Sequence, residues 1–248
     1  MKQTLENFQE LSTNQKFLEY IATETTYTYV RTLQKGSESI LYLLENRRTH
    51  ERVVLKRMRK KTLKRSKYRA RYECELDALQ HMQHAHIPQL LMSGEVARVP
   101  YKLLTYIQGT PLAKASPYSN IEALTLIARV SAALKPFHAQ GYVHGHLTPE
   151  HILVEGETVQ FVGLDYIAVT TPHPTMPYKV KKIAHDIDQL ARLFLALTDT
   201  TQRFKWKKAD SYVLQQMPPS PLQHILKQAL YLKYEEVDQF ITHLKQAI

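Results

Sequence analysis

The chain has 248 residues, 44% of them hydrophobic, and a formal net charge of +10 from 33 Lys and Arg against 23 Asp and Glu. This length suits one large domain or two lobes that share a core. It contains no run of about 18 apolar residues, and residues 1–22 carry charges and glutamines where a signal peptide needs an apolar core. We therefore expect neither a membrane span nor export. The single cysteine, Cys74, is compatible with a reducing cytoplasm, the expected location.

The positive charge is concentrated in a few segments. Residues 56–71 contain ten Lys or Arg and no acid, and residues 179–182 and 203–208 form smaller basic clusters. One interpretation is a solvated face, and the other is a docking surface for an acidic or phosphorylated protein partner. Aromatic residues do not interleave with the run at a stacking spacing, and no known nucleic-acid-binding motif is present, so nucleic acid is an unlikely partner.

The first half of the chain predicts one helix followed mainly by strands. Residues 3–22 have a helical pattern, with one apolar stripe formed by Leu5, Phe8, Leu11, Phe17 and Ile21. Short runs rich in β-branched and aromatic residues then predict antiparallel strands at "YTYVRTL", "SILYLLEN" and "RVVLKRM". A helix is expected over 66–83, and two further strands at "QLLMSGEV" and "YKLLTYI".

The second half predicts mostly helices. Residues 120–141 form a long amphipathic pattern that opens with an Asn120 cap and ends on Gly141. Two short strands follow at "HILVE" and "VQFVGL", and then helices near 184–198, 220–231 and 235–247. Strands followed by helices indicate an α+β chain in two lobes with a hinge near 105–110.

Several short segments fall in an order that resembles the protein-kinase fold over roughly residues 28–247. They are "VVLK" (53–56), Glu75 on the first long helix after it, "LLTYIQGTPL" (103–112), "HGHLTPEHIL" (144–153), "VQFVGLD" (159–165) and "HDIDQLARLFLAL" (185–197). The resemblance implies a β-rich small lobe at 28–108 and a mostly helical large lobe at 109–248. Residues 1–27 are then an N-terminal helical extension.

The resemblance assigns a nucleotide site to residues of both lobes. Lys56 takes the place of the lysine that pairs with nucleotide phosphates, and Glu75 that of its glutamate partner. Leu104 is similar to a hinge gatekeeper, and Val54 and Leu153 fall where kinases sandwich adenine. A structural ion pair that fixes the helix is an equally good interpretation of Lys56 and Glu75.

The residues that kinases use for chemistry are replaced. His146 stands at the catalytic aspartate, His151 at the metal-binding asparagine and Gly163 at the metal-binding aspartate of D-F-G. In the loop that covers the phosphates only Gly36 remains of three glycines. Two positions with structural roles are kept: His144, and Asp186, which we expect to be buried and to accept backbone N–H bonds from the catalytic loop.

These substitutions bear unequally on catalysis. A histidine can act as a general base, but magnesium prefers oxygen ligands and imidazole replaces them poorly. A shift of the alignment would instead make Asp165 the metal-binding aspartate. The three histidines at 144, 146 and 151 also allow a transition-metal site, although packing and surface positions explain them better.

The sequence therefore predicts a pseudokinase: an inactive kinase-like domain with a somewhat reduced large lobe, because residues 165–186 are short and lack A-P-E. It would act as an allosteric or scaffolding module that binds a protein through residues 56–71. No cofactor is required, and ATP bound weakly without magnesium stays open. The alternative is an atypical ATP-dependent phosphotransferase, or another nucleotide-dependent transferase, that uses Lys56 and Glu75.

Overall fold

A computed structural model describes residues 2–82, 84–114, 117–200 and 204–248, with side chains from Gln9 onward. The chain forms two compact units, residues 1–83 with 88–107, and residues 84–87 with 108–248. The sequence placed the boundary at 108/109 and set the first 27 residues apart, whereas the first unit includes the N-terminal helix.

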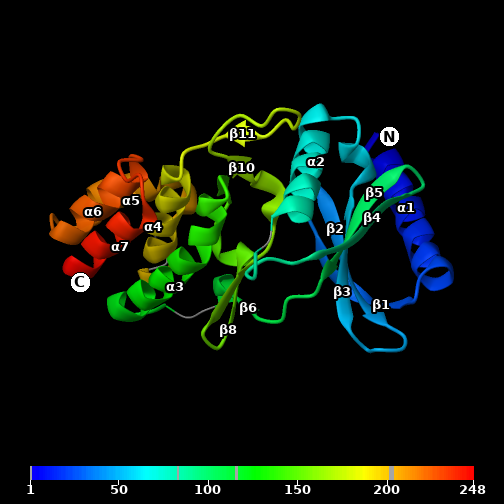
Figure 1. Ribbon diagram of the computed structural model, residues 1–248, viewed down its shortest axis with the longest axis horizontal. Coiled ribbons are helices and arrows are strands. Elements are labelled where there is room, and N and C mark those ends of the chain that lie inside the picture. Colours follow the sequence, from blue (N-terminus) through cyan, green and yellow to red (C-terminus); the bar gives the residue numbers. More distant parts are fainter. Residues whose placement is uncertain (1, 83, 115–116, 201–203) are drawn as a thin grey trace. The chain divides into compact units, whose positions relative to one another are not determined.

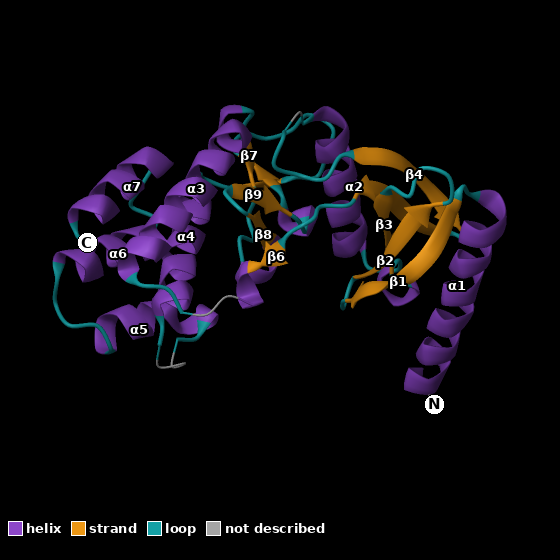
Figure 2. Ribbon diagram, turned by 90° about the horizontal axis from the view of Figure 1, so that it is seen from below, coloured by secondary structure: helices purple, strands orange, loops and turns teal. Residues whose placement is uncertain are grey.

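The first unit is a five-stranded antiparallel sheet with a long helix on each face (Figures 1 and 2). The strand order is β1-β2-β3-β5-β4. The elements are α1 (Lys2–Glu24), β1 (Tyr27–Lys35), β2 (Ser39–Asn46), β3 (Arg52–Met58), the 3-10 helix η1 (Lys60–Thr62), α2 (Ser66–His81), β4 (Leu90–Val96) and β5 (Val99–Thr105).

Alternation along the strands gives the sheet two different faces. One face packs with α1 through a buried apolar cluster that includes Phe17, Ile21, Tyr42, Leu55 and Leu103. The opposite face carries two rows of paired residues, Leu41, Lys56 and Lys102 in one and Leu43, Val54 and Leu104 in the other. The predicted lysine Lys56 therefore lies on the face away from α1.

The apolar stripe predicted for the first helix is only partly right. Phe17 and Ile21 are buried, but Leu11 is 69% exposed and the inward position is taken by Thr13, 2% exposed. A helix turns about 100° per residue, so Leu11 lies roughly 120° around the helix from Phe17. The side chains of Leu5 and Phe8 lie outside the described residues.

The second unit is mostly helical (Figure 1). Helices α3 (Asn120–Ala139), α4 (Ala184–Thr198), α5 (Ala209–Gln215), α6 (Pro221–Leu230) and α7 (Val237–Gln246) form its bulk, with 3-10 turns η2 (Leu112–Lys114) and η5 (Trp206–Lys208). Helix α4 packs against α3, α6 and α7. The sequence did not predict α5, which follows the basic cluster at 203–208 and precedes the Pro-rich turn.

Two small sheets and two 3-10 turns of the second unit carry His151, Leu153 and Asp165, whereas Asp186 lies on α4 and His144, His146 and Gly163 lie in connecting loops. The sheets have the orders β6-β8-β9 and β11-β10-β7. Their elements are β6 (Thr110–Pro111), β7 (Tyr142–Val143), η3 (Pro149–His151), β8 (Ile152–Glu155), β9 (Thr158–Phe161), η4 (Leu164–Tyr166), β10 (Ala168–Val169) and β11 (Lys179–Val180).

The cap of α3 differs from the prediction by one residue. Ser119, not Asn120, is the N-cap: its hydroxyl accepts from the Glu122 backbone N–H, and the Glu122 carboxylate accepts from the Ser119 N–H. This reciprocal pair satisfies two backbone donors that a helix start leaves open. An Asn at 120 offers no comparable second bond, so the Ser-Glu pair sets where the helix begins.

Candidate functional site

Three buried charged side chains meet on the α2 side of the first unit. The Lys56 ammonium donates to both Glu75 carboxylate oxygens, at 2.8 and 2.9 Å, and Lys102 of β5 donates to Glu75 Oε2 at 2.7 Å. Lys56 is 6%, Glu75 3% and Lys102 0% exposed. The structure thus brings the predicted pair together and adds a second lysine to it.

Sequence reasoning missed Lys102, although a signal was present. Strand alternation places Lys102 two residues before Leu104, and hence on the same face. Leu104 is buried, and half-buried Val54 lies directly opposite it in β3. The third residue assigned to adenine, Leu153, is half-buried in β8 of the second unit.

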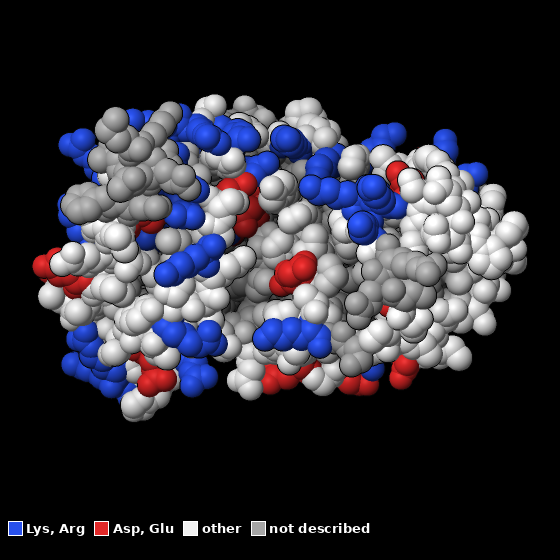
Figure 3. All heavy atoms as spheres, turned by 180° about the vertical axis from the view of Figure 1, so that it is seen from behind, with Lys and Arg blue, Asp and Glu red and all other residues white. Residues whose placement is uncertain are grey.

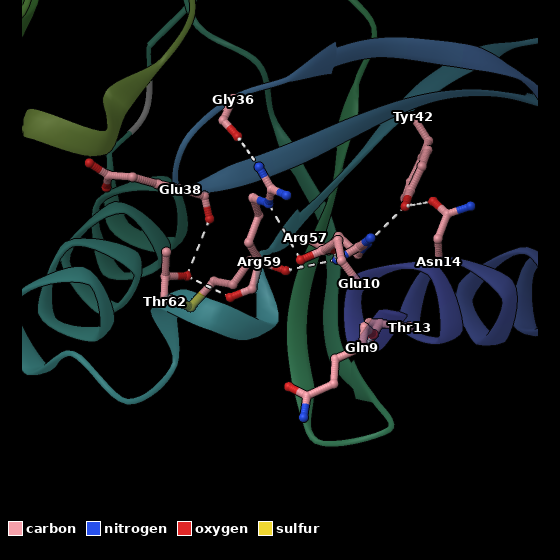
Figure 4. Close-up of polar contacts among 11 residues, drawn as sticks. Gln9, Glu10, Thr13, Asn14, Gly36, Glu38, Tyr42, Arg57, Arg59 and Thr62 are labelled. Carbon is pink, nitrogen blue, oxygen red and sulfur yellow. Dashed lines mark hydrogen bonds and ion pairs between the residues drawn. The ribbon is translucent and has the colours of Figure 1, made fainter. Parts of the chain in front are cut away.

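The 34–39 turn, which the sequence resemblance aligned with the phosphate-covering loop, is held by hydrogen bonds and an ion pair within the first unit (Figure 4). The Gly36 carbonyl accepts from Arg59 Nη1 at 3.2 Å. The Glu38 carbonyl accepts from the Arg59 N–H at 2.9 Å and from Thr62 Oγ1 at 3.4 Å. The Glu38 carboxylate pairs with Arg71 of α2 at 2.6 Å. Four contacts therefore hold the turn, two from Arg59 before η1, one from Thr62 of η1 and one from Arg71 of α2.

Helix α1 reaches the same turn through charged side chains (Figure 4). Glu10 pairs with Arg57 at 2.7 Å and with Arg59 at 3.4 Å. Arg57 is fully buried, donates to the Tyr42 hydroxyl at 2.8 Å and lies 5.1 Å from the centre of the Phe17 ring. Arg59 thus links Glu10 on α1 to the Gly36 carbonyl, a connection that sequence reasoning did not find.

Asp186 anchors the loop that begins with His144. One carboxylate oxygen accepts from the His144 N–H and from His138 Nε2, both at 2.9 Å, and the other accepts from the Gly145 N–H at 2.8 Å. Complete burial alone would raise the pKa of Asp186, but the His138 contacts and the other donors outweigh it and lower that pKa. This is the burial and bonding expected of a structural aspartate.

His144 is a packed, neutral side chain. It is 0% exposed and its ring lies 5.5 Å from Phe161 and 6.0 Å from Phe137. Burial lowers its pKa to about 4, although Asp186 opposes the shift. Its Nδ1 accepts from the His146 backbone N–H at 3.4 Å.

Position 145, directly after His144, accommodates only glycine. Its φ is +76°, and an added Cβ would collide with the carbonyl oxygen of Tyr166. Its own carbonyl accepts from Gln189 Nε2 at 3.1 Å and from Lys181 Nζ at 3.3 Å. Gln189 also accepts from the Leu147 N–H. Sequence reasoning did not identify Gln189 as a support of this loop.

Gly163, which the sequence resemblance aligned with the D-F-G aspartate, lies close to a histidine. Its φ is +73°, and an added Cβ would lie 2.6 Å from His151 Cδ2 and 2.8 Å from His151 Nε2. His151 is held there because its Nδ1 donates to the His146 carbonyl at 3.0 Å. The imidazole therefore fills the space that an aspartate side chain would need.

His146 keeps some capacity to accept a proton. Its ring lies 4.8 Å from that of His151 and 4.5 Å from that of Tyr166, and its buried Nδ1 has no hydrogen-bond partner among the described residues. Burial, and then His151, lower its pKa, so the ring is neutral near pH 7. Asp165, half-buried on η4, acts electrostatically on His146 in the opposite direction.

The residues present do not fit a magnesium ion. The two positions that the sequence resemblance assigns to metal ligands hold the His151 imidazole and Gly163, which has no side chain, whereas magnesium prefers carboxylate and water oxygens. Within the described ranges, no group of three or more His, Cys, Asp or Glu side chains is arranged to hold a metal. The helices described are also too short or too polar to cross a membrane.

Comparison with known proteins places these features in a family. Myosin light chain kinase A of Dictyostelium discoideum is 27% identical over 138 residues, which cover 54% of this chain and 46% of that protein. Serine/threonine-protein kinase PknD of Mycobacterium tuberculosis is 29% identical over 132 residues, 52% of this chain and 20% of that protein. The chain thus matches less than half of the length of either relative.

A solved structure matches more of the chain. The crystal structure of the Mycobacterium tuberculosis PknI kinase domain superposes with a TM-score of 0.65 and 17% identity, and covers 90% of this chain and 96% of that one. The family model described as "Protein kinase domain" matches residues 27–166, more than half of the sequence. The chain belongs to the protein kinase domain family.

Proposed function

We propose that this protein is a pseudokinase, which binds a protein partner and does not transfer phosphate. The observation that carries this proposal is the contact between Gly163 and His151. Phosphoryl transfer depends on metal ions that bridge the β and γ phosphates and neutralise the developing charge. Gly163 has no side chain to bind a metal, and the His151 imidazole fills the space beside it. A rotamer change of His151 would clear the space but would not supply the ligand.

The fixed 34–39 turn supports the same conclusion. Kinases use a Gly-rich loop to cover the nucleotide phosphates. Here Arg59 donates to the Gly36 carbonyl, Thr62 donates to the Glu38 carbonyl, and Arg71 forms an ion pair with the Glu38 carboxylate. A turn bonded in this way has less freedom to close over a ligand.

The runner-up is an atypical ATP-dependent phosphotransferase. It is favoured by the bonded Lys56–Glu75 pair, by the neutral imidazole of His146, and by the curated relatives, which are named as kinases. In that case His146 would take the hydroxyl proton and Asp165 would act in place of the lost metal ligand.

Calorimetric titration with ATP, with and without magnesium, separates the two functions when it is combined with a phosphotransfer assay on the protein itself and on a generic protein substrate. We expect no turnover, and any ATP affinity to be unchanged by magnesium and lost in Lys56→Ala. Turnover that His146→Ala or Asp165→Asn abolishes would establish the phosphotransferase instead.

The partner surface that we propose is narrower than the whole basic run. Of its ten cations, Lys56 and Arg57 are buried, and Arg59 and Arg71 pair with Glu10 and Glu38. Six are exposed and form what we call the basic ridge: Lys60, Lys61, Lys64, Arg65, Lys67 and Arg69. On the face seen in Figure 3, Lys and Arg form several groups with acidic side chains between them. The ridge has no acid within its own sequence, which suits an acidic protein segment.

A further inference from the structure

Lys102 occupies an electrostatically unusual position. It lies directly opposite Lys56 in the β3–β5 ladder, and like charges at directly paired positions normally destabilise a sheet. Both ammonium groups are buried, where water cannot screen them. The Glu75 carboxylate bridges them, with contacts of 2.8 Å to Lys56 and 2.7 Å to Lys102.

Lys102 contacts α2 at more than the carboxylate. Its ammonium donates to the Tyr72 backbone carbonyl at 3.1 Å and lies 4.0 Å from the centre of the Tyr72 ring, a cation–π distance. The Tyr72 hydroxyl in turn donates to the Tyr101 carbonyl of β5 at 2.8 Å. Strand β5 therefore contacts one turn of α2, from Tyr72 to Glu75, through hydrogen bonds and a cation–π contact that do not involve Lys56.

We propose that Lys102 is a positioning residue that holds α2 against the sheet without help from Lys56. In protein kinases the strand lysine and the helix glutamate must come together for activity, and movement of the helix controls this pairing. In this chain Glu75 has a second, fully buried lysine partner on β5. Lys102 thereby keeps α2 against the sheet, and the position of α2 does not depend on whether the Lys56–Glu75 pair forms.

The charges give the reason why either lysine suffices. Removal of Lys56 leaves one carboxylate and one ammonium, which is a neutral buried pair with good hydrogen bonds. Removal of both leaves a buried carboxylate without a cation, and breaking a buried pair in this way is strongly destabilising, by about 3–5 kcal/mol, or roughly 100-fold or more. The response to a single and to a double substitution should therefore differ sharply.

Amide hydrogen exchange over residues 66–81 of the full chain tests this, with residues 39–46 of β2 as the internal reference. We expect α2 exchange in Lys56→Met within about threefold of the unmodified protein, because Lys102 still pairs with Glu75. Lys102→Met should exchange about tenfold faster through loss of the Tyr72 contacts. The double variant should exchange about 100-fold faster or more. Lys64→Met, an exposed lysine, is the matched control.

Two results would overturn the role of Lys102: release of α2 in Lys56→Met to the extent seen in the double variant, or unchanged exchange in Lys102→Met. If the double variant does not fold, the triple variant Lys56→Met, Lys102→Met, Glu75→Met removes all three charges, and recovery of the fold in it assigns the defect to the unpaired carboxylate. Failure of the triple variant to fold counts against that assignment. Exchange over α2 does not depend on phosphate transfer, so its outcome is separate from that of the ATP titration.

Discussion

Single residues decide what chemistry the second unit can support. A positive φ and a close contact act together at Gly163, where the His151 imidazole meets any added Cβ. At Gly145 the Tyr166 carbonyl does the same. An aspartate introduced at 163 would therefore require His151 to move.

We predict that Gly163→Ala lowers the free energy of unfolding by about 2–4 kcal/mol, the sum of left-handed strain and overpacking. Gly156→Ala is the matched control, because Gly156 also has a positive φ, +57°, but no atom lies within 4 Å of an added Cβ. It should cost only about 1–2 kcal/mol. Urea unfolding measures both, and in a His151→Ala background the two glycine variants should cost about the same. Equal costs in the unmodified chain would contradict the crowding.

Buried histidines predict acid sensitivity. Burial lowers the pKa of His144 and of His84 to about 4, and His86 adds to the shift at His84. The unfolded chain titrates these groups near 6.5. Between pH about 4 and 6.5 the unfolded state binds more protons, so stability falls as the pH falls.

Urea unfolding at pH 7, 6 and 5 checks this. We expect the free energy of unfolding to decline on acidification, and His84→Asn to reduce the decline by up to about 1.4 kcal/mol per pH unit. Asn keeps an acceptor for the His86 N–H, which bonds to His84 Nδ1 at 3.1 Å. Exposed His224→Asn serves as the control and should leave the pH dependence unchanged. Parallel profiles for both variants and the unmodified protein would refute the assignment.

At the scale of elements, α1 is an integral part of the first unit. Its Phe17 and Ile21 complete the apolar cluster, and its Glu10 supplies the acid for buried Arg57. The same Glu10 pairs with Arg59, which holds the Gly36 carbonyl. Docking of α1 and the position of the 34–39 turn are thus coupled through one acidic residue.

We predict that Glu10→Gln destabilises the protein by about 2–4 kcal/mol, because Arg57 stays buried without its counter-charge. Hydrogen exchange should rise in α1 and in residues 34–39. Glu19→Gln, an exposed acid on the same helix, should change neither. If exchange rose in α1 alone, the coupling to the turn would be wrong.

At the scale of the whole molecule, the charge of +10 separates into cations that hold the fold and cations that face solvent. Within residues 56–71, four belong to the first group and the basic ridge to the second. Arg57 and Lys102 show that a basic residue can be a core residue, provided that an acid pairs with it.

We predict that poly-glutamate binds the basic ridge and that affinity falls as salt rises. Lys61→Gln, Lys64→Gln, Lys67→Gln should weaken binding roughly tenfold by fluorescence anisotropy. The matched triple Lys205→Gln, Lys207→Gln, Lys208→Gln removes the same charge from another cluster and should have a smaller effect. Tighter binding of a single-stranded oligonucleotide at equal salt would favour nucleic acid over an acidic protein.

The sequence alone determined the positions of the long elements and the family, because hydrophobic periodicity and short motifs are local properties. The strands at 39–46 and 52–58 and the helix at 184–198 lie where the pattern predicted them. The sequence also has histidine at 146 and 151 and glycine at 163, positions where its resemblance to kinases predicts catalytic and metal-binding residues.

Only the tertiary structure decided which side chains surround these residues. The contact of Gly163 with His151 depends on a backbone φ, and the pairing of Glu75 with Lys102 and of Glu10 with Arg57 joins residues 27 and 47 positions apart. Such contacts are set by which strand faces and helix faces meet, and no local pattern carries that information. The sequence specifies which charged side chains are present, and the fold determines which of them are brought together in the interior.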